Sequence, residues 1–165
     1  MSSRGVHFAL APADAERLLA LDDPDQLVEF ISEDLEERYF EAREWIVQTD
    51  NAWDAIHRCL ADGRLVYASG PIPLRHAVLG GEPLDAGDDY TACFVTPAQV
   101  QELAPALARV TREWFAARYA TLAETDYGPT SAEDLAYTWR WFEGLPEFFA
   151  KAAKAGRAVL FTTDA

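Results

Sequence analysis

Hydrophobic and polar residues alternate near the start of the chain, in the stretch GVHFALAP. Val6, Phe8 and Leu10 fall on one side of an extended chain, and His7 and Ala9 fall on the other. A period of two residues is typical of a strand that buries one face, so we expect a half-buried strand here. The runs RLVYAS, YTACFV and RAVLFTTD predict further strands, which makes about four in all.

Most other hydrophobic residues recur every three or four positions, the period of an amphipathic helix. Start signals support several of these helices: Asp23 precedes Pro24, and Thr96 and Gln99 form a capping box. Thr49 or Asp50 is expected to cap the next helix after the one that Asp23 begins. The expected helices cover residues 13–21, 22–45, 49–63, 96–103, 112–123 and 131–156, with a break or restart at Pro105 and a bend at residues 144–146.

Few strands among many helices predict an α+β fold. We expect a single domain over residues 1–165, with a small mixed or antiparallel sheet of about four strands packed with five to seven helices. A length of 165 residues is ordinary for one domain, and 50% hydrophobic residues suffice for a core. The sequence contains no internal repeat and no interdomain linker.

Charge is the strongest feature of the composition. The chain carries 28 acidic and 14 basic residues, a net charge of −14, and has no basic run. We therefore expect no binding to nucleic acid and none to a membrane surface, because both need clustered Lys and Arg. The sequence shows no signal peptide and no apolar run long enough to span a membrane, so a cytoplasmic location with reduced thiols is expected. An acidic surface would attract a cationic partner.

The stretch TDNAWDAIHRCL holds the most conspicuous candidate chemistry. On a helix, His57 shares an apolar face with Trp53, whereas Asp54 lies four residues before Arg58 and can pair with it. One interpretation makes His57 a general acid or base that Asp50 or Asp54 orients. The other makes His57 a buried histidine that bonds a backbone carbonyl.

Other residues give weaker signals. Cys59 and Cys93 are too few for a disulfide framework and are expected to be inert core residues. His7, His57 and His76 lie on three separate elements without metal-ligand spacing, so we expect no metal and no cofactor. The loop SGPIPLRHAVLGG lacks the lysine of a phosphate loop. The candidate ligand-binding residues are Trp53, Arg75, His76, Gly80 and Gly81.

Several motifs resemble the YfbM-like family of bacterial domains of unknown function. They are RGVHFALAPADAERLLA, DNAWDAIHRCLADG, PLRHAVLGGEPL, TPAQVQELAPAL and FFAKAAKAGRAVLFTTD, and they span nearly the whole chain. Asn51 departs from the pattern, where the family often carries Lys. The resemblance implies an α+β fold and carries no established activity. The positions that match the pattern are Asp50, Trp53, His57, Leu74, Gly80 and Gly81.

Two functions remain open at this point. The first is a non-catalytic binding or interaction module for a protein or a small-molecule ligand, with an immunity- or inhibitor-like role against a basic partner as a special case. The second is a small-molecule enzyme that uses His57 in a cleft beside the loop from Gly70 to Gly81. A purely structural, oligomer-forming domain is a third hypothesis, and the sequence does not fix the oligomeric state.

Overall fold

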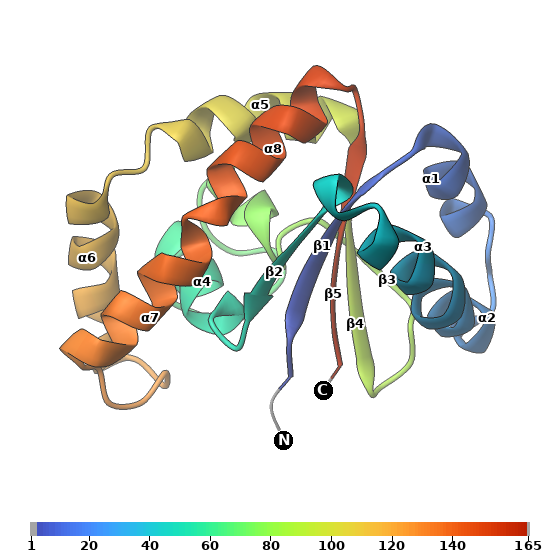
Figure 1. Cartoon of the computed structure of the whole chain (residues 1–165). Helices are drawn as coiled ribbons and strands as arrows, with labels where there is room; N and C mark the ends of the chain where they lie inside the picture. The colour runs from blue at the N-terminus through green and yellow to red at the C-terminus, as the bar shows by residue number, and fades with distance from the viewer. Residues whose placement is uncertain (1–2, 165) are drawn as a thin grey trace.

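The computed structural model describes residues 3–164, which form a five-stranded antiparallel sheet with helices on both faces (Figure 1). The strand order is β2-β1-β5-β4-β3. This confirms the predicted α+β class, with an antiparallel sheet and five strands where about four were expected. The strands are β1 (Gly5–Leu10), β2 (Ile46–Asp50), β3 (Glu82–Leu84), β4 (Tyr90–Val95) and β5 (Ala158–Asp164).

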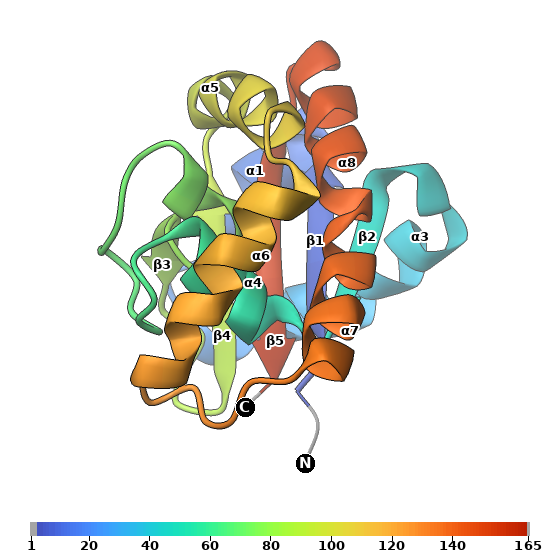
Figure 2. The same cartoon turned by 90° about the vertical axis from the view of Figure 1, so that its left-hand side faces the viewer.

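The helices divide between the two faces of the sheet, as the two views show (Figures 1 and 2). One face is covered by α1 (Pro12–Leu19), α2 (Pro24–Glu29) and α3 (Glu36–Glu41), with the π-helical turn η1 (Phe30–Leu35) between the last two. The short 3₁₀ turn η2 (Arg43–Trp45) leads into β2. The other face is covered by α4 (Trp53–Leu60), η3 (Leu74–Ala77), α5 (Pro97–Ala108), α6 (Arg112–Ala120), η4 (Thr121–Glu124), α7 (Ala132–Phe142) and α8 (Gly144–Lys154).

Each face of the sheet carries its own hydrophobic core. Phe8 and Leu10 of β1 point toward α1 to α3, whereas Ala9 points toward α4 to α8. His7 lies on the same face as Ala9 and is fully buried against Phe148, Phe149 and Phe161. The alternation in the sequence was therefore interpreted correctly as a strand, but β1 is buried on both faces and not on one.

The predicted strand RLVYAS is wrong. Residues 64–69 form an irregular loop, and the strand that was missed is β2, which pairs with β1 on its outer side. β2 begins directly after a long helical pattern, and its five residues, IVQTD, do not alternate between hydrophobic and polar. The sequence therefore gives no separate strand signal here. The sequence predicts a loop at β3 as well, because this strand has only three residues and includes Pro83.

Helix ends follow the sequence signals at most positions. Asp23, Thr96 and Ser131 cap α2, α5 and α7 through their side chains. α4 is different, since Ala52 precedes it and neither Thr49 nor Asp50 caps it. α5 also continues through Pro105 without a break. Among residues 3–164, no helix combines the length and the apolar composition that crossing a bilayer demands.

Candidate functional site

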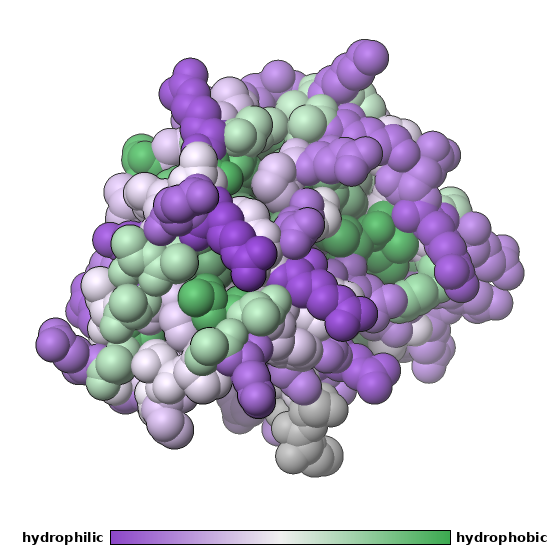
Figure 3. Space-filling view, turned by 60° about the vertical axis from the view of Figure 1, so that its left-hand side comes forward, coloured by the Kyte–Doolittle hydropathy of each residue, from purple (hydrophilic) through white to green (hydrophobic). Residues whose placement is uncertain are grey.

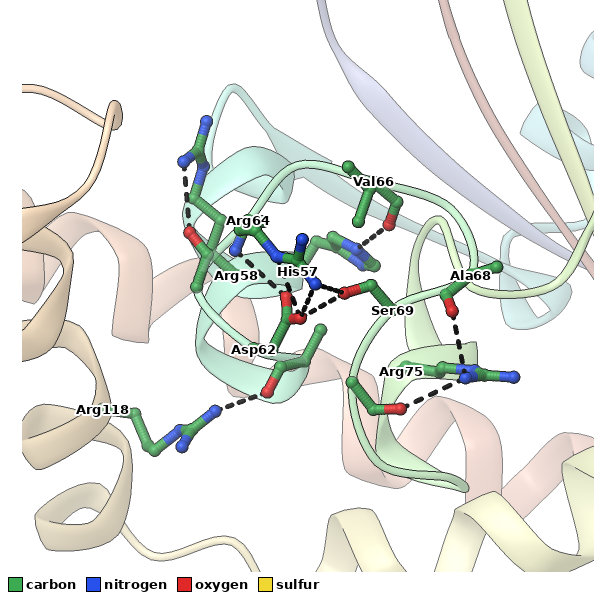
Figure 4. A network of polar contacts seen from close by, with 12 residues as sticks. His57, Arg58, Asp62, Arg64, Val66, Ala68, Ser69, Arg75 and Arg118 are labelled. Carbon is green, nitrogen blue, oxygen red and sulfur yellow. Dashed lines mark hydrogen bonds and ion pairs between the residues drawn. The ribbon is translucent and has the colours of Figure 1, made fainter.

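A loop between α4 and η3 presents a group of apolar side chains to solvent. We call residues 62–73 the anchored loop. The exposed fractions are 36% for Leu65, 39% for Val66, 43% for Tyr67 and 62% for Ile72. Three of these residues are consecutive, which is unusual for large apolar side chains outside an interface. Polar side chains from the loop and from its neighbours hold the backbone in place (Figure 4).

His57 forms the first anchor. Its Nδ1 accepts a hydrogen bond from the Leu79 amide at 3.3 Å, so Nε2 carries the proton and donates to the Val66 carbonyl at 2.9 Å. The side chain is 1% exposed. Burial lowers the pKa of His57, because desolvation disfavours the imidazolium form, while the bond to Val66 acts in the opposite direction. The neutral ring thus joins α4 to both ends of the segment 66–79.

A second anchor lies within the anchored loop itself. The Asp62 carboxylate accepts from Arg64 Nη2 at 2.6 Å and from the Ser69 hydroxyl, and Arg64 Nη2 also donates to Ser69 Oγ at 2.7 Å. The bonds from Arg64 and Ser69 lower the pKa of Asp62 to about 2. The carboxylate therefore stays ionised at neutral pH and ties the start of the loop to its middle.

Two arginines complete the anchoring. Arg75 Nη1 donates to the carbonyls of Ala68 at 3.3 Å and Gly70 at 3.2 Å. Arg118 of α6 donates through Nε to the Cys59 carbonyl at 3.1 Å and through Nη2 to the Ala61 carbonyl. These bonds satisfy carbonyls at the end of α4 and within the loop that no backbone amide of the described chain pairs, which ties the irregular segment to η3 and α6.

Glycines allow the close approaches on which this arrangement depends. Gly70 has φ +101° and lies against the Ala61 backbone, which a Cβ atom would meet at 2.7 Å. A Cβ at Gly80 would overlap the carbonyl of Arg75, and one at Gly81 would lie 2.7 Å from the Phe94 carbonyl. The paired glycines therefore serve backbone packing next to the anchored loop.

The two acids proposed as partners of His57 bind elsewhere. Asp54 pairs with Arg58 at 2.6 Å, as its spacing predicts, and the same guanidinium reaches Asp126. Asp50 accepts from the Tyr137 hydroxyl at 2.5 Å. Its backbone has φ +48°, an uncommon conformation for a residue other than glycine.

The remaining sequence candidates are mostly interior residues. Trp53 donates from Nε1 to the Ser3 carbonyl and packs on Phe161. His76 is 7% exposed, and burial lowers its pKa. Within residues 3–164, no three His, Cys, Asp or Glu side chains converge as metal ligands. Burial raises the pKa of the thiols of both Cys59 and Cys93 to about 12, so these thiols stay protonated at neutral pH.

Sequence reasoning missed Asp62, Arg64, Ser69 and Arg118. The first two follow the end of α4 as DGR, which reads only as a turn, and Ser69 lay inside the supposed strand. Arg118 lies 57 residues from the carbonyl of Ala61, so no local pattern indicates the contact. The sequence offers one signal for this loop, which is the apolar run LVY at residues 65–67 directly after the turn residues DGR at 62–64.

Comparison with known proteins assigns the chain to a family. The model of the family described as "Domain of unknown function (DUF1877)" matches residues 1–162. The chain belongs to the DUF1877 family. Its structure is similar to the crystal structure of YfbM, a protein of unknown function from Escherichia coli, with a TM-score of 0.61 and 16% identity over 99% of each chain. At that identity the likeness shows the fold alone, and no curated protein matches the chain.

Proposed function

We propose that this DUF1877 protein is a non-catalytic binding module that contacts a protein partner through the anchored loop. The observation that carries the proposal is the group of four exposed apolar side chains on a loop whose carbonyls at Val66, Ala68 and Gly70 are bonded by side chains. Large apolar side chains exposed at consecutive positions, as at residues 65–67, are typical of interaction sites. Loops on a rigid scaffold are also the usual carriers of binding function.

The anchoring supports binding in a second way. A flexible loop loses conformational freedom when a partner immobilises it, and that loss weakens the complex. His57 and Arg75 bond carbonyls within the anchored loop, and Arg118 bonds carbonyls directly before it, so side chains constrain the backbone before a partner arrives. Tyr67 contributes a large side chain with few rotatable bonds, the type that interfaces favour.

The charge of the molecule favours a basic partner. A net charge of −14 attracts a cationic protein over a distance and speeds its encounter. Apolar contacts at the anchored loop would then determine how long the complex lasts, because short-range packing mainly sets the dissociation rate. An immunity- or inhibitor-like role is one form of this proposal.

The catalytic role of His57 stays a prediction. Proton transfer to a ligand needs a ring nitrogen within hydrogen-bonding reach of that ligand. Here Nε2 donates to Val66 and Nδ1 accepts from Leu79, so one of these bonds would have to open first. The geometry therefore supports an anchoring role for His57 more directly than a catalytic one.

Affinity capture with matched variants tests the proposal. Tyr67→Asp and Ile72→Asp place a charge on the anchored loop, whereas Leu19→Asp places one at a similarly exposed leucine, 53% exposed, on α1. We expect the wild type and Leu19→Asp to retain the same basic protein from a lysate of the native host. Both loop variants should retain at least tenfold less of it.

Two results would count against the proposal. One is retention of the same protein by all four forms, which would place the contact elsewhere. The other is a metabolite that the wild type converts and His57→Gln does not, with both forms folded, because this would support the enzyme.

A further inference from the structure

A cavity of about 470 Å³ lies along the outer edge of the sheet, beside β2. Phe40 of α3 and Arg43 of η2 line one end, and Arg140 and Trp141 of α7 line the other. The cavity is far from the anchored loop in sequence and shares no residue with it. Figure 3 shows a hydrophobic area at this place, over β2, framed by hydrophilic side chains.

The cavity runs beside the backbone of β2 and not over one face of the sheet. Ile46, Val47 and Gln48 all line it. Successive side chains of a strand point to opposite faces, so a cavity that contacts three in a row lies along the strand's edge. Lining residues from α3 and from α7, which cover opposite faces of the sheet, agree with this placement.

Among the described residues, no strand pairs with the outer backbone edge of β2. β2 is the last strand of the sheet and pairs only with β1. The Ile46 amide donates to the Arg43 carbonyl of η2, and among the described residues no further element outside β1 bonds the backbone of residues 47 and 48. Such an edge can accept one more strand.

Two arginines give the cavity a charge opposite to that of the molecule. Five of the twelve arginines pair with a carboxylate in the described chain, among them Arg38, Arg58 and Arg64. Arg43 and Arg140 are exposed and take part in none of the ion pairs among residues 3–164. The residues that line the cavity include these two guanidinium groups and no Asp or Glu, although the chain has twice as many acids as bases, so the cavity favours an anionic ligand.

We infer that this cavity binds an extended acidic peptide segment, which adds to the sheet as a sixth strand beside β2. The peptide backbone pairs with the outer edge of β2 beyond Ile46, and its carboxylates bind Arg43 and Arg140. Its apolar side chains pack on Phe40 and Trp141, which lie on opposite sides of the edge. Because side chains alternate along the added strand, neighbouring residues of the peptide reach opposite sides.

A peptide-binding measurement tests the inference. The probe is a set of capped hexapeptides with two acidic and two apolar residues in varied order, labelled with a zwitterionic dye and followed by fluorescence anisotropy. We expect some members to bind with dissociation constants on the order of 100 μM or tighter. Arg43→Glu and Arg140→Glu should each weaken binding about tenfold or more, as expected for a lost charge-assisted hydrogen bond.

Matched controls separate this site from general attraction to arginine. Arg112→Glu removes another exposed arginine, on α6, which forms no ion pair within residues 3–164, and it should leave peptide affinity unchanged. The same peptides with Lys in place of the acids should not bind. Peptides methylated on alternate backbone nitrogens should lose affinity in one of the two possible registers, because methylation blocks strand pairing.

Three outcomes would overturn the inference. They are the absence of any saturable binding, equal loss in Arg112→Glu, and unchanged affinity of both methylated registers. The last would indicate a site for free carboxylates without strand addition. Circular dichroism of each variant confirms that it is folded, and Tyr67→Asp should bind the peptides normally, which keeps this site distinct from the anchored loop.

Discussion

His57 is central to the site at the scale of single residues. The sequence places it correctly on the inner face of α4, and the spacing of Asp54 and Arg58 correctly predicts their ion pair. Its two backbone partners, Val66 and Leu79, were beyond reach of the sequence, because both lie in irregular segments after the helix. A periodic pattern therefore shows which side chains point inward, but it does not show which backbone groups they meet.

Loss of the His57 ring should destabilise the protein. In His57→Ala the Val66 carbonyl and the Leu79 amide lose their buried partner, and we expect the free energy of unfolding to fall by about 3 kcal/mol. Urea denaturation measures this free energy of unfolding. Arg112→Ala, an exposed substitution on α6, should change it by less than about 0.5 kcal/mol, and an equally small effect of His57→Ala would refute the anchoring role.

His7 should make stability depend on pH. Burial lowers its pKa from 6.5 to about 4, although the bond to the Ala77 carbonyl opposes this. The unfolded chain therefore binds a proton below pH 6.5 that the native chain does not, and stability falls as the pH drops. Between pH 7 and pH 5 the wild type should lose about 2 kcal/mol more than His7→Gln. Parallel losses in the two proteins would contradict this.

Elements with a strong local pattern could be predicted from the sequence, and short ones could not. β1, β4, β5 and the capped helices have a clear period or a clear start signal. β2 becomes a strand only because β1 lies beside it, and the hydrophobic run at residues 64–69 stays a loop because side chains satisfy its carbonyls. Tertiary partners decide both cases.

The turn around Gly80 should tolerate no side chain. A Cβ there would overlap the Arg75 carbonyl, which is backbone and cannot move aside alone. Gly80→Ala should therefore lower the midpoint of thermal unfolding by several degrees or prevent folding, a cost of about 3 kcal/mol or more. Gly128→Ala has open space and only a positive φ to overcome, so about 1 kcal/mol is expected. Equal losses in the two variants would show that the close contact at Gly80 does not matter.

At the scale of the whole molecule, charge should control both stability and association. A net charge of −14 makes the folded chain repel itself, and added salt screens that repulsion. Between about 10 mM and 300 mM NaCl we expect the thermal midpoint to rise by about 3 °C, measured by calorimetry. A falling midpoint would mean that the native ion pairs outweigh the repulsion.

Site-specific photo-cross-linking is the most direct test of the binding role. A benzophenone amino acid replaces Tyr67 on the anchored loop in one form and Leu19 on α1 in the other, and both are irradiated in cells of the native host. We expect one dominant adduct to a basic protein from position 67 and none from position 19. The same adduct from both positions, or none from position 67 while position 19 reacts, would contradict this expectation.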